Sequence, residues 1–361
     1  MKKTLAFLLT LSMVLTLSLT GCAKKSGRVV NVCGWGENID PDLITAFEKE
    51  TGITVNYATA ESNETMYALI KQGGADYDVI VPSDYMIAQM IAEDMLAELN
   101  FGNIPNFSLI DSQYKNLPYD PENKYSVPYT WGTLGIIYNS AIVSEEIDSW
   151  GVLFTDSGRY AGSIGMIGNP RDAIGAALLY LGYSVNTTNE AEIEEAYQLL
   201  SDAKSGGAYQ GFFMDQLYDK MESGETAICT YYAGDFLSMY MNNSDLRFVV
   251  PKEGSNWFVD AMCVLKDAEH KEEAEAWINF LCKTESSLAN MDFIWYASPN
   301  AEALEQYPAY YEEKNGEPLD PMLYEVMAAP AGVLSRCEPY NALPSETQAL
   351  YSDLWVQLGI E

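Results

Sequence analysis

The sequence contains a single histidine, His270, and few basic residues, with 20 Lys and Arg against 52 Asp and Glu. One histidine leaves little for histidine-based catalysis or a histidine metal site, so we expect neither a metal nor a cofactor. Removal of Lys2 and Lys3 with a leader would change the net charge from −32 to −34, because 18 basic residues then remain. A surface this acidic repels nucleic acid and attracts cations.

The cysteines show no C-x-x-C pair and no spacing typical of a metal site. Beyond Cys22 there are five, an odd count that forbids complete internal pairing. Most have apolar neighbours, so we expect buried thiols, while a single disulfide stays open. The five are Cys33, Cys229, Cys263, Cys282 and Cys337.

The N-terminus carries a long apolar run at 5–19, preceded by Lys2 and Lys3. This run is short for a membrane span and is typical of an export signal, which we place at 1–21. It ends in Leu-Thr-Gly-Cys, which resembles the lipobox of bacterial lipoproteins, in which the cysteine becomes the acylated N-terminus. We therefore expect Cys22 to be lipidated (a palmitate-type anchor) and residues 22–27 to form a tether. The domain would then be held on the outer face of the cell membrane, facing a periplasm or the exterior.

The folded part is long enough for two domains and rich enough in aromatics to exclude disorder, with 25 Tyr, 12 Phe and 7 Trp. Strands are predicted at 28–32, 53–57 and 79–81, separated by helices at 39–50 and 62–72. This order indicates an α/β fold with a mostly parallel sheet.

A second lobe is expected to begin within the extended segment 125–139, in which Gly132 and Gly135 are candidate hinges. The segment 252–260 resembles the return crossing, followed by a strand at 261–265. We predict lobe 1 at 28–130 plus 260–300, and lobe 2 at 131–259 plus 301–361. Elements expected in lobe 2 are strands at 164–167, 226–232 and 247–250 and helices at 173–181, 190–201 and 214–222.

The most informative stretch is the strand 79–81, because Pro82 ends it and Ser83, Asp84 and Tyr85 follow. Ligands of open α/β sheets bind at the carboxyl ends of the strands, so these side chains should face a crevice. A polar turn into the next helix explains the same residues without a ligand.

Rings and carboxylates recur at the other loops expected to face this crevice. These residues are Trp35, Glu37, Asp172, Tyr231, Tyr232, Asp235, Phe258, Asp260 and Tyr296. Taken singly, a ring is more often core and an Asp more often a helix cap. Taken together, they favour a slot of rings with acids at both ends, which suits a linear organic cation with amines at its two ends. Arg171 is the one basic residue in these loops, which argues against anionic ligands.

Over essentially its whole mature length the chain resembles the spermidine/putrescine-binding proteins of bacterial ABC importers. The motifs that carry the resemblance are ESNETMY at 61–67, YDVIVPS at 77–83, YSVPY at 125–129, LGYS at 181–184, PKEG at 251–254 and INFL at 278–281. The resemblance implies a type II periplasmic-binding-protein-like fold, in which two α/β lobes, each with a mixed, mostly parallel sheet, close around a hinge. It also implies capture of a polyamine, putrescine or spermidine, and delivery to a membrane permease.

Carried over by position, the resemblance implies that Asp260 grips one amine and that Asp172 lies near the other end. Trp35, Tyr85, Tyr296 and Phe258 match ring positions, and Ser83 matches a polar contact. Tyr232 to Asp235 resembles a turn of the putrescine-preferring branch, so Asp235 takes an amine. Asn38 stands where a Tyr is common, Asn169 replaces an acid, and Asn341 lies near a glutamine of the pattern. With Glu37 and Asp84, these residues form the predicted ligand site.

Two alternatives remain at this stage. The same fold could bind another organic cation or a basic amino acid, in which case Arg171 would have to meet an α-carboxylate. A secreted hydrolase could use paired carboxylates such as Asp84 and Asp260. No hydrolase signature is found, and we expect a monomer without enzymatic activity.

Overall fold

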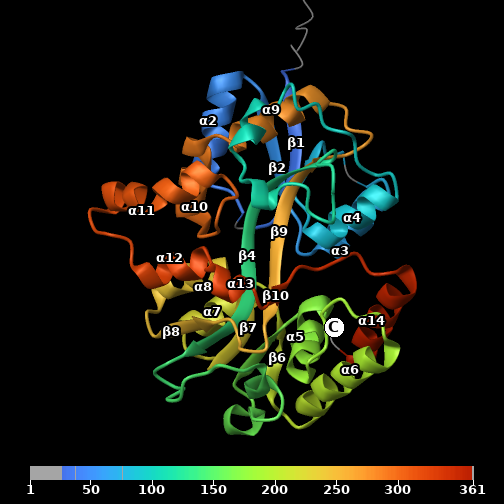
Figure 1. Ribbon diagram of the computed structural model, residues 1–361, viewed down its shortest axis with the longest axis vertical. Helices are drawn as coiled ribbons and strands as arrows, with labels where there is room; N and C mark the ends of the chain where they lie inside the picture. The colour runs from blue at the N-terminus through green and yellow to red at the C-terminus, as the bar shows by residue number, and fades with distance from the viewer. Residues whose placement is uncertain (1–26, 37, 75, 360–361) are drawn as a thin grey trace, which may run out of the picture.

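The computed structural model describes residues 27–36, 38–74 and 76–359 of the chain. Figure 1 shows two lobes stacked along the long axis, with the described N-terminal end at the far end of one and the last helix, α14 (Ser345–Leu358), in the other. The predicted two-lobed α/β fold is confirmed. The export signal and the lipobox predicted at 1–22 lie outside the described residues.

The upper lobe is built on β1 (Val29–Gly34), which pairs in parallel with β2 (Thr54–Thr59) and β3 (Val79–Ile80). Val32 and Cys33 are neighbours whose side chains point to opposite faces, and both are buried, so this sheet is covered on both faces, as parallel sheets are. Its helices are α2 (Pro41–Thr51), α3 (Asn63–Lys71), α4 (Asp84–Ala92), α9 (Lys271–Leu281) and α10 (Thr284–Ile294). Short 3-10 helices lie at Pro105–Leu109 and Ser112–Tyr114, and two more, at Trp150–Leu153 and Ser157–Tyr160, belong to the lower lobe.

Two long antiparallel strands, β4 (Ser126–Asn139) and β9 (Ser255–Val264), run side by side through both lobes (Figure 1). Their register extends from Ser126 opposite Cys263 to Thr133 opposite Trp257, with an irregularity after Pro128, where proline cannot donate to the ladder. The crossing at 252–260 and the strand at 261–265, predicted separately, are therefore largely one strand.

The lower lobe continues the sheet, because β4 also pairs with β7 (Ile228–Tyr232) and β8 (Leu246–Val249), both antiparallel. Beyond β7 lie β5 (Ile164–Ile167) and β6 (Tyr209–Phe213), joined in parallel. The surrounding helices are α5 (Pro170–Leu181), α6 (Glu190–Ser205), α7 (Gln216–Glu222) and α8 (Ala233–Asn242). Strands run in both directions, which confirms the prediction of a mixed sheet.

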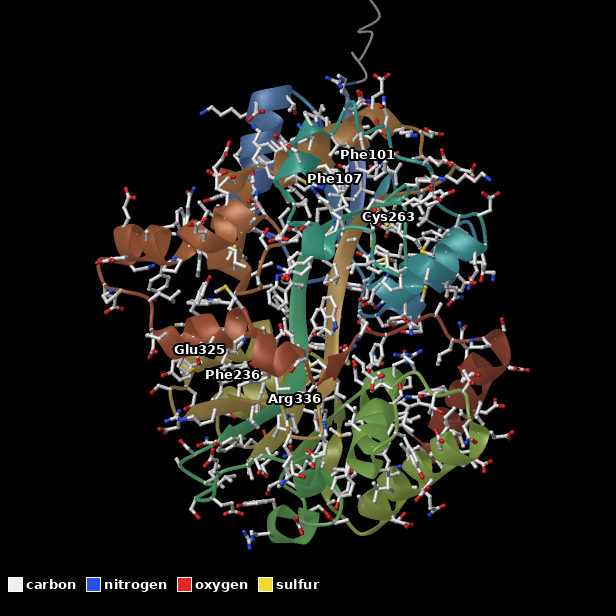
Figure 2. The ribbon with its side chains drawn as sticks, in the orientation of Figure 1. Phe101, Phe107, Phe236, Cys263, Glu325 and Arg336 are labelled. Carbon is white, nitrogen blue, oxygen red and sulfur yellow. The ribbon has the colours of Figure 1, made fainter. Side chains whose placement is uncertain are left out.

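The C-terminal part of the chain, from α11 (Ala301–Asn315) onward, crosses from the upper lobe to the lower lobe. Helix α11 packs against α10, whereas α12 (Pro321–Met327) packs against α8. Figure 2 places Glu325 of α12 and Phe236 of α8 in the same part of the lower lobe. After α13 (Ala331–Leu334), β10 (Cys337–Glu338) pairs in parallel with β9. The predicted lobe limits remain a prediction. The limit predicted after residue 300 would assign α11 to lobe 2, although α11 packs against α10, which was predicted in lobe 1.

Gly132 and Gly135, predicted as hinges, make room for rings beside β4. A Cβ atom on Gly132 would lie 3.1 Å from Cζ of Phe258 and 3.2 Å from Cε1 of Tyr296, and one on Gly135 would lie 2.4 Å from Cζ of Phe248. Glycine therefore allows aromatic side chains to contact the backbone of the crossing strand. Whether β4 also bends at these positions remains a prediction.

The five described cysteines are free thiols, four of them buried and Cys337 half-buried. His270 directly precedes α9, and its Nδ1 lies 3.1 Å from Oδ2 of the buried Asp78. Within 27–36, 38–74 and 76–359, no set of three His, Cys, Asp or Glu side chains is placed to hold a metal. None of the helices in these ranges combines the length and apolar character needed to cross a bilayer.

Candidate functional site

A cavity of about 430 Å³ lies between the lobes. It is lined by the end of β1, the N-terminal turns of α3, α4, α5 and α8, the middle of β9, and residues near α10 and α14. The predicted site residues that line it are Trp35, Asn38, Ser83, Asp84, Tyr85, Asn169, Asp172, Tyr232, Asp235, Phe258, Asp260 and Tyr296. The structure thus brings these residues together, although they are far apart in the sequence.

Asp260, in the middle of β9, is fixed by two donors from the upper lobe. Ser83 Oγ donates to its Oδ1 at 2.7 Å, and Trp35 Nε1 donates to its Oδ2 at 3.0 Å. Burial raises the pKa of Asp260 to about 6, although both hydrogen bonds lower it. Above that pH the group is a buried carboxylate with a fixed orientation. Both of its described hydrogen-bond donors, Ser83 and Trp35, are uncharged.

Asp172, in the first turn of α5, is also held by two side-chain donors, one on each carboxylate oxygen. The hydroxyl of Tyr232 donates to Oδ2 at 2.7 Å, and that of Tyr340 donates to Oδ1 at 2.9 Å. Burial raises its pKa to about 6, opposed by these two bonds. Asn169 caps α5 by accepting from the amide of Arg171 at 2.9 Å, so its oxygen is already engaged.

Asp235, in the first turn of α8, is the third carboxylate. Tyr296 donates to Oδ2 at 2.7 Å, and Tyr218 donates to Oδ1. The preceding residue has to be small, because a Cβ atom on Gly234 would lie 2.3 Å from Cε2 of Tyr296. Glycine therefore lets a ring from the segment after α10 reach the start of α8.

A wall of rings connects these carboxylates. Ring centroids are 5.1 Å apart for Tyr231 and Tyr232, 5.4 Å for Tyr232 and Phe258, and 6.3 Å for Phe258 and Tyr296. Such rings offer apolar faces to methylene groups and negative faces to ammonium groups. Among the described residues that line the cavity, none is basic.

Asp84 differs from the other acids. The residue is 2% exposed, its Oδ1 accepts the amide of Tyr85 at 2.7 Å, and burial raises its pKa to about 8 although backbone hydrogen bonds from Tyr85 and Val259 oppose the rise. At neutral pH it is therefore mainly a neutral carboxylic acid. It lines the cavity as a polar group and adds little negative charge.

Two predicted residues are not on the cavity wall as described. Glu37 lies outside the described residues. Asn341 is exposed, and its amide donates to Oδ1 of Asn186 at 2.8 Å. The preceding residue, Tyr340, lines the cavity instead.

Arg171 packs away from the cavity. It is 7% exposed, its Cζ lies 4.4 Å from the ring centroid of Tyr340, and Nη2 donates to Oδ1 of Asn186 at 3.5 Å. It is not among the residues that line the cavity. An amino acid bound there would therefore lack the arginine that its carboxylate requires.

Sequence reasoning missed several lining residues, among them Tyr340, Tyr218, Asp215 and Asn63. Asn63 accepts from the amide of Ser83 at 3.0 Å and donates to its Oγ at 3.0 Å, so it supports the Asp260 site from behind. Asn63 belongs to the motif at 61–67, and this could have indicated that it lies near the ligand site. Tyr218 lies on a helix whose polar pattern indicates only a surface helix.

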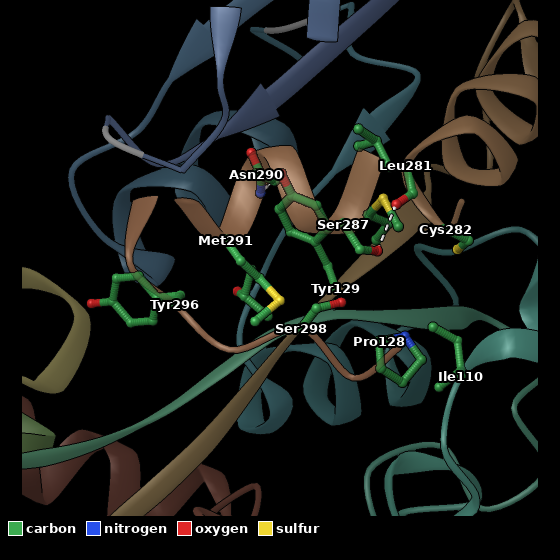
Figure 3. Close-up of a pocket in the computed structure, with 12 residues that line it drawn as sticks. Ile110, Pro128, Tyr129, Leu281, Cys282, Ser287, Asn290, Met291, Tyr296 and Ser298 are labelled. Carbon is green, nitrogen blue, oxygen red and sulfur yellow. Dashed lines mark hydrogen bonds between the residues drawn. The ribbon is translucent and has the colours of Figure 1, made fainter. Parts of the chain in front are cut away.

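A second cavity, of about 10 Å³, lies behind Tyr296 (Figure 3). Figure 3 shows Tyr129 beside Asn290, whose Nδ2 donates to the tyrosine hydroxyl at 2.9 Å, and that hydroxyl in turn donates to the carbonyl of Asn38 at 2.8 Å. This volume suits one water molecule and no organic ligand. The large cavity is therefore the candidate binding site.

Comparisons with known proteins place the chain among transport proteins. The family model described as bacterial extracellular solute-binding protein matches residues 42–315. A spermidine/putrescine-binding periplasmic protein of Salmonella typhimurium is 37% identical over 272 residues, which cover 74% of this chain and 77% of that protein. A putrescine-binding periplasmic protein of Pseudomonas aeruginosa is 29% identical, over 96% of both chains.

A solved structure gives the same result for the fold. A putative spermidine/putrescine ABC transporter protein from Listeria monocytogenes superposes with a TM-score of 0.84 at 35% sequence identity. The match covers 92% of this chain and 99% of that one. The predicted type II periplasmic-binding-protein fold is confirmed by this similarity.

Proposed function

This chain belongs to the family of bacterial extracellular solute-binding proteins, and we propose that it captures a polyamine, putrescine or spermidine, for an ABC importer. The observation that carries the proposal is the cavity itself. Three carboxylates, each held by two side-chain donors, share a wall of rings in which no described lining residue is basic, and two of them, Asp172 and Asp260, are buried while Asp235 is half-buried. The named relatives bind the same class of ligand.

Binding would use charge at the ends of the ligand and apolar contact along its length. An ammonium group that leaves water needs a carboxylate close by, and Asp260 and Asp172 are fixed in advance for that purpose. The rings of Tyr232, Phe258 and Tyr296 would cover the methylene groups and add cation–π attraction. Because donors and acceptors are already oriented, little ordering is needed when the ligand enters.

The contact residues of this proposal are the twelve predicted residues on the cavity wall, with Glu37 and Asn341 kept as sequence predictions only. Lobe closure is also part of the proposal: Asp260 and its partners lie at the upper side, whereas Asp172 and Asp235 start helices of the lower lobe. A ligand that touches both sides stabilises the closed form, because only that form makes both sets of contacts.

The alternatives have less support. A basic amino acid would need an arginine on the cavity wall, and Arg171 is engaged elsewhere. The relatives are binding proteins rather than enzymes, so a hydrolase that pairs Asp84 with Asp260 is not favoured.

The direct test is the identity of the ligand that the protein carries. Small molecules released by denaturing the purified, unrefolded protein should include putrescine or spermidine at close to one per chain, as measured by mass spectrometry. A stoichiometric molecule without amines would refute the proposal. Protein that carries nothing would be titrated with polyamines, as described at the end of the Discussion.

We further propose that the protein is anchored by a lipid on Cys22 and delivers its ligand as a monomer to the transmembrane subunits of the importer. Cys22→Ser should move the protein from the membrane fraction to the soluble fraction and leave polyamine affinity unchanged, because the proposed ligand contacts involve other residues. Light scattering should give the mass of one chain. A Cys22→Ser protein that stays in the membrane fraction would contradict the anchor.

A further inference from the structure

Tyr340 lies on the segment between β10 and α14, which runs along the boundary between the lobes (Figure 1). Its side chain is 6% exposed. Its hydroxyl lies 2.9 Å from Oδ1 of Asp172 and 3.0 Å from the carbonyl oxygen of Arg171, so its single proton serves both acceptors at the start of α5. A segment distant in sequence therefore fixes one oxygen of a cavity carboxylate.

The ring of Tyr340 makes contacts on both sides of the boundary. It meets the ring of Tyr85, from α4 in the upper lobe, edge to face at a centroid distance of 6.1 Å. On the lower side, the guanidinium carbon of Arg171 lies 4.4 Å from its centroid. The same side chain thus contacts a cavity ring of one lobe and the carboxylate-bearing helix of the other.

Helix α5 is shaped to admit this hydroxyl. A Cβ atom on Gly175, one turn after Asp172, would lie 2.9 Å from the Tyr340 hydroxyl oxygen. That is closer than real Cβ contacts normally come, so alanine would push the hydroxyl or the helix aside. A glycine costs helix stability, and here it leaves space for the contact.

We propose that Tyr340 is a positioning residue of the polyamine site, which orients the Asp172 carboxylate for the ligand ammonium and links it to Tyr85 across the lobes. The inference rests on the proposed function. The other charged and titratable groups around Asp172 are Tyr232 from β7, Arg171 from α5 and Glu64 from α3. Tyr232 alone would leave one oxygen of the carboxylate without its side-chain donor.

Tyr340→Phe tests this role, because it keeps the ring and removes only the hydroxyl. We expect a dissociation constant for putrescine or spermidine about 10-fold higher at pH 7.5, the size of one hydrogen bond to a charged group. The loss should grow as the pH falls toward 6, because removing a donor to the carboxylate raises the pKa of Asp172. Carbon-13 NMR of that carboxyl in ligand-free protein measures the pKa directly.

Tyr209→Phe is the matched control, because the Tyr209 hydroxyl on β6 is buried and has no hydrogen-bond partner in the described part of the chain. It should bind like the unaltered protein. Gly175→Ala should weaken binding in the same direction as Tyr340→Phe without changing a polar group.

The outcomes separate the inference from the proposed function. A Tyr340→Phe protein with unchanged affinity and an unchanged Asp172 pKa overturns the inference alone. So does a loss of affinity that is equal from pH 6 to 8 with the pKa unchanged, which would indicate packing rather than positioning. If the unaltered protein binds no polyamine, the proposed function fails and the inference fails with it.

Discussion

Asp260→Asn is expected to raise the dissociation constant for putrescine or spermidine at least about 10-fold, the scale of a charge-assisted bond in a buried site. Asparagine has the same shape but no charge. The ligand ammonium would leave water without a carboxylate to replace it, and the new amide protons would face the donors Ser83 and Trp35. Isothermal titration calorimetry at pH 7.5 measures the change.

The matched control is Asp267→Asn, which removes the same charge from an exposed position just after β9. Asp267 does not line the cavity and its charge faces solvent, where salt screens it, so this variant should bind normally. Equal affinity of Asp260→Asn and the unaltered protein would show that this carboxylate does not hold the ligand.

Lowering the pH from 7.5 to 5 is expected to weaken polyamine binding by roughly 100-fold, about 10-fold for each of two carboxylates one unit below its pKa. Burial raises the pKa of both Asp172 and Asp260 to about 6, so both gain protons over this range. The amines of the ligand keep their charge, because their pKa lies far above neutrality. Titrations at several pH values measure the dependence.

Protonation of Asp172 and Asp260 does not itself destabilise the folded state, as the direction of their pKa shifts shows. An acid whose pKa is higher in the folded than in the unfolded state binds protons more tightly when folded. For Asp172 and Asp260, falling pH between about 6 and 4 therefore favours the folded state. Circular dichroism melting curves at each pH provide the check. Affinity that stays constant from pH 7.5 to 5 in folded protein would mean that neither carboxylate needs its charge.

Much of the cavity was predictable because it lies where strands end. Ser83, Asp84 and Tyr85 follow the buried strand β3, and Trp35 follows β1, so the α/β pattern alone directs them to one edge. Asp84 and Tyr85 were expected in a loop, yet they form the first turn of α4. Their place at the cavity did not depend on that difference, because the N-terminus of the helix lies at the same edge.

Other parts depend on contacts between distant segments that local patterns do not encode. The two-donor design of Asp172 requires Tyr340, which lies 168 residues away and carries no local signal of a binding role. The pairing of β4 with β9 makes the sheet continuous between the lobes, whereas the sequence indicated one mixed, mostly parallel sheet in each lobe. Strand β6 was missed because its residues are all half-buried and show no alternation.

The most direct test of the account is a calorimetric titration of ligand-free, folded protein with putrescine, cadaverine, spermidine and spermine, beside butylamine and arginine as controls. We expect saturable binding of putrescine or spermidine at one per chain. Butylamine should bind far more weakly because it reaches one carboxylate only, and arginine should also bind weakly because its carboxylate finds no basic partner in the cavity. Absence of heat with every polyamine, or tight binding of arginine alone, would contradict the claim that opposed carboxylates hold a linear cation.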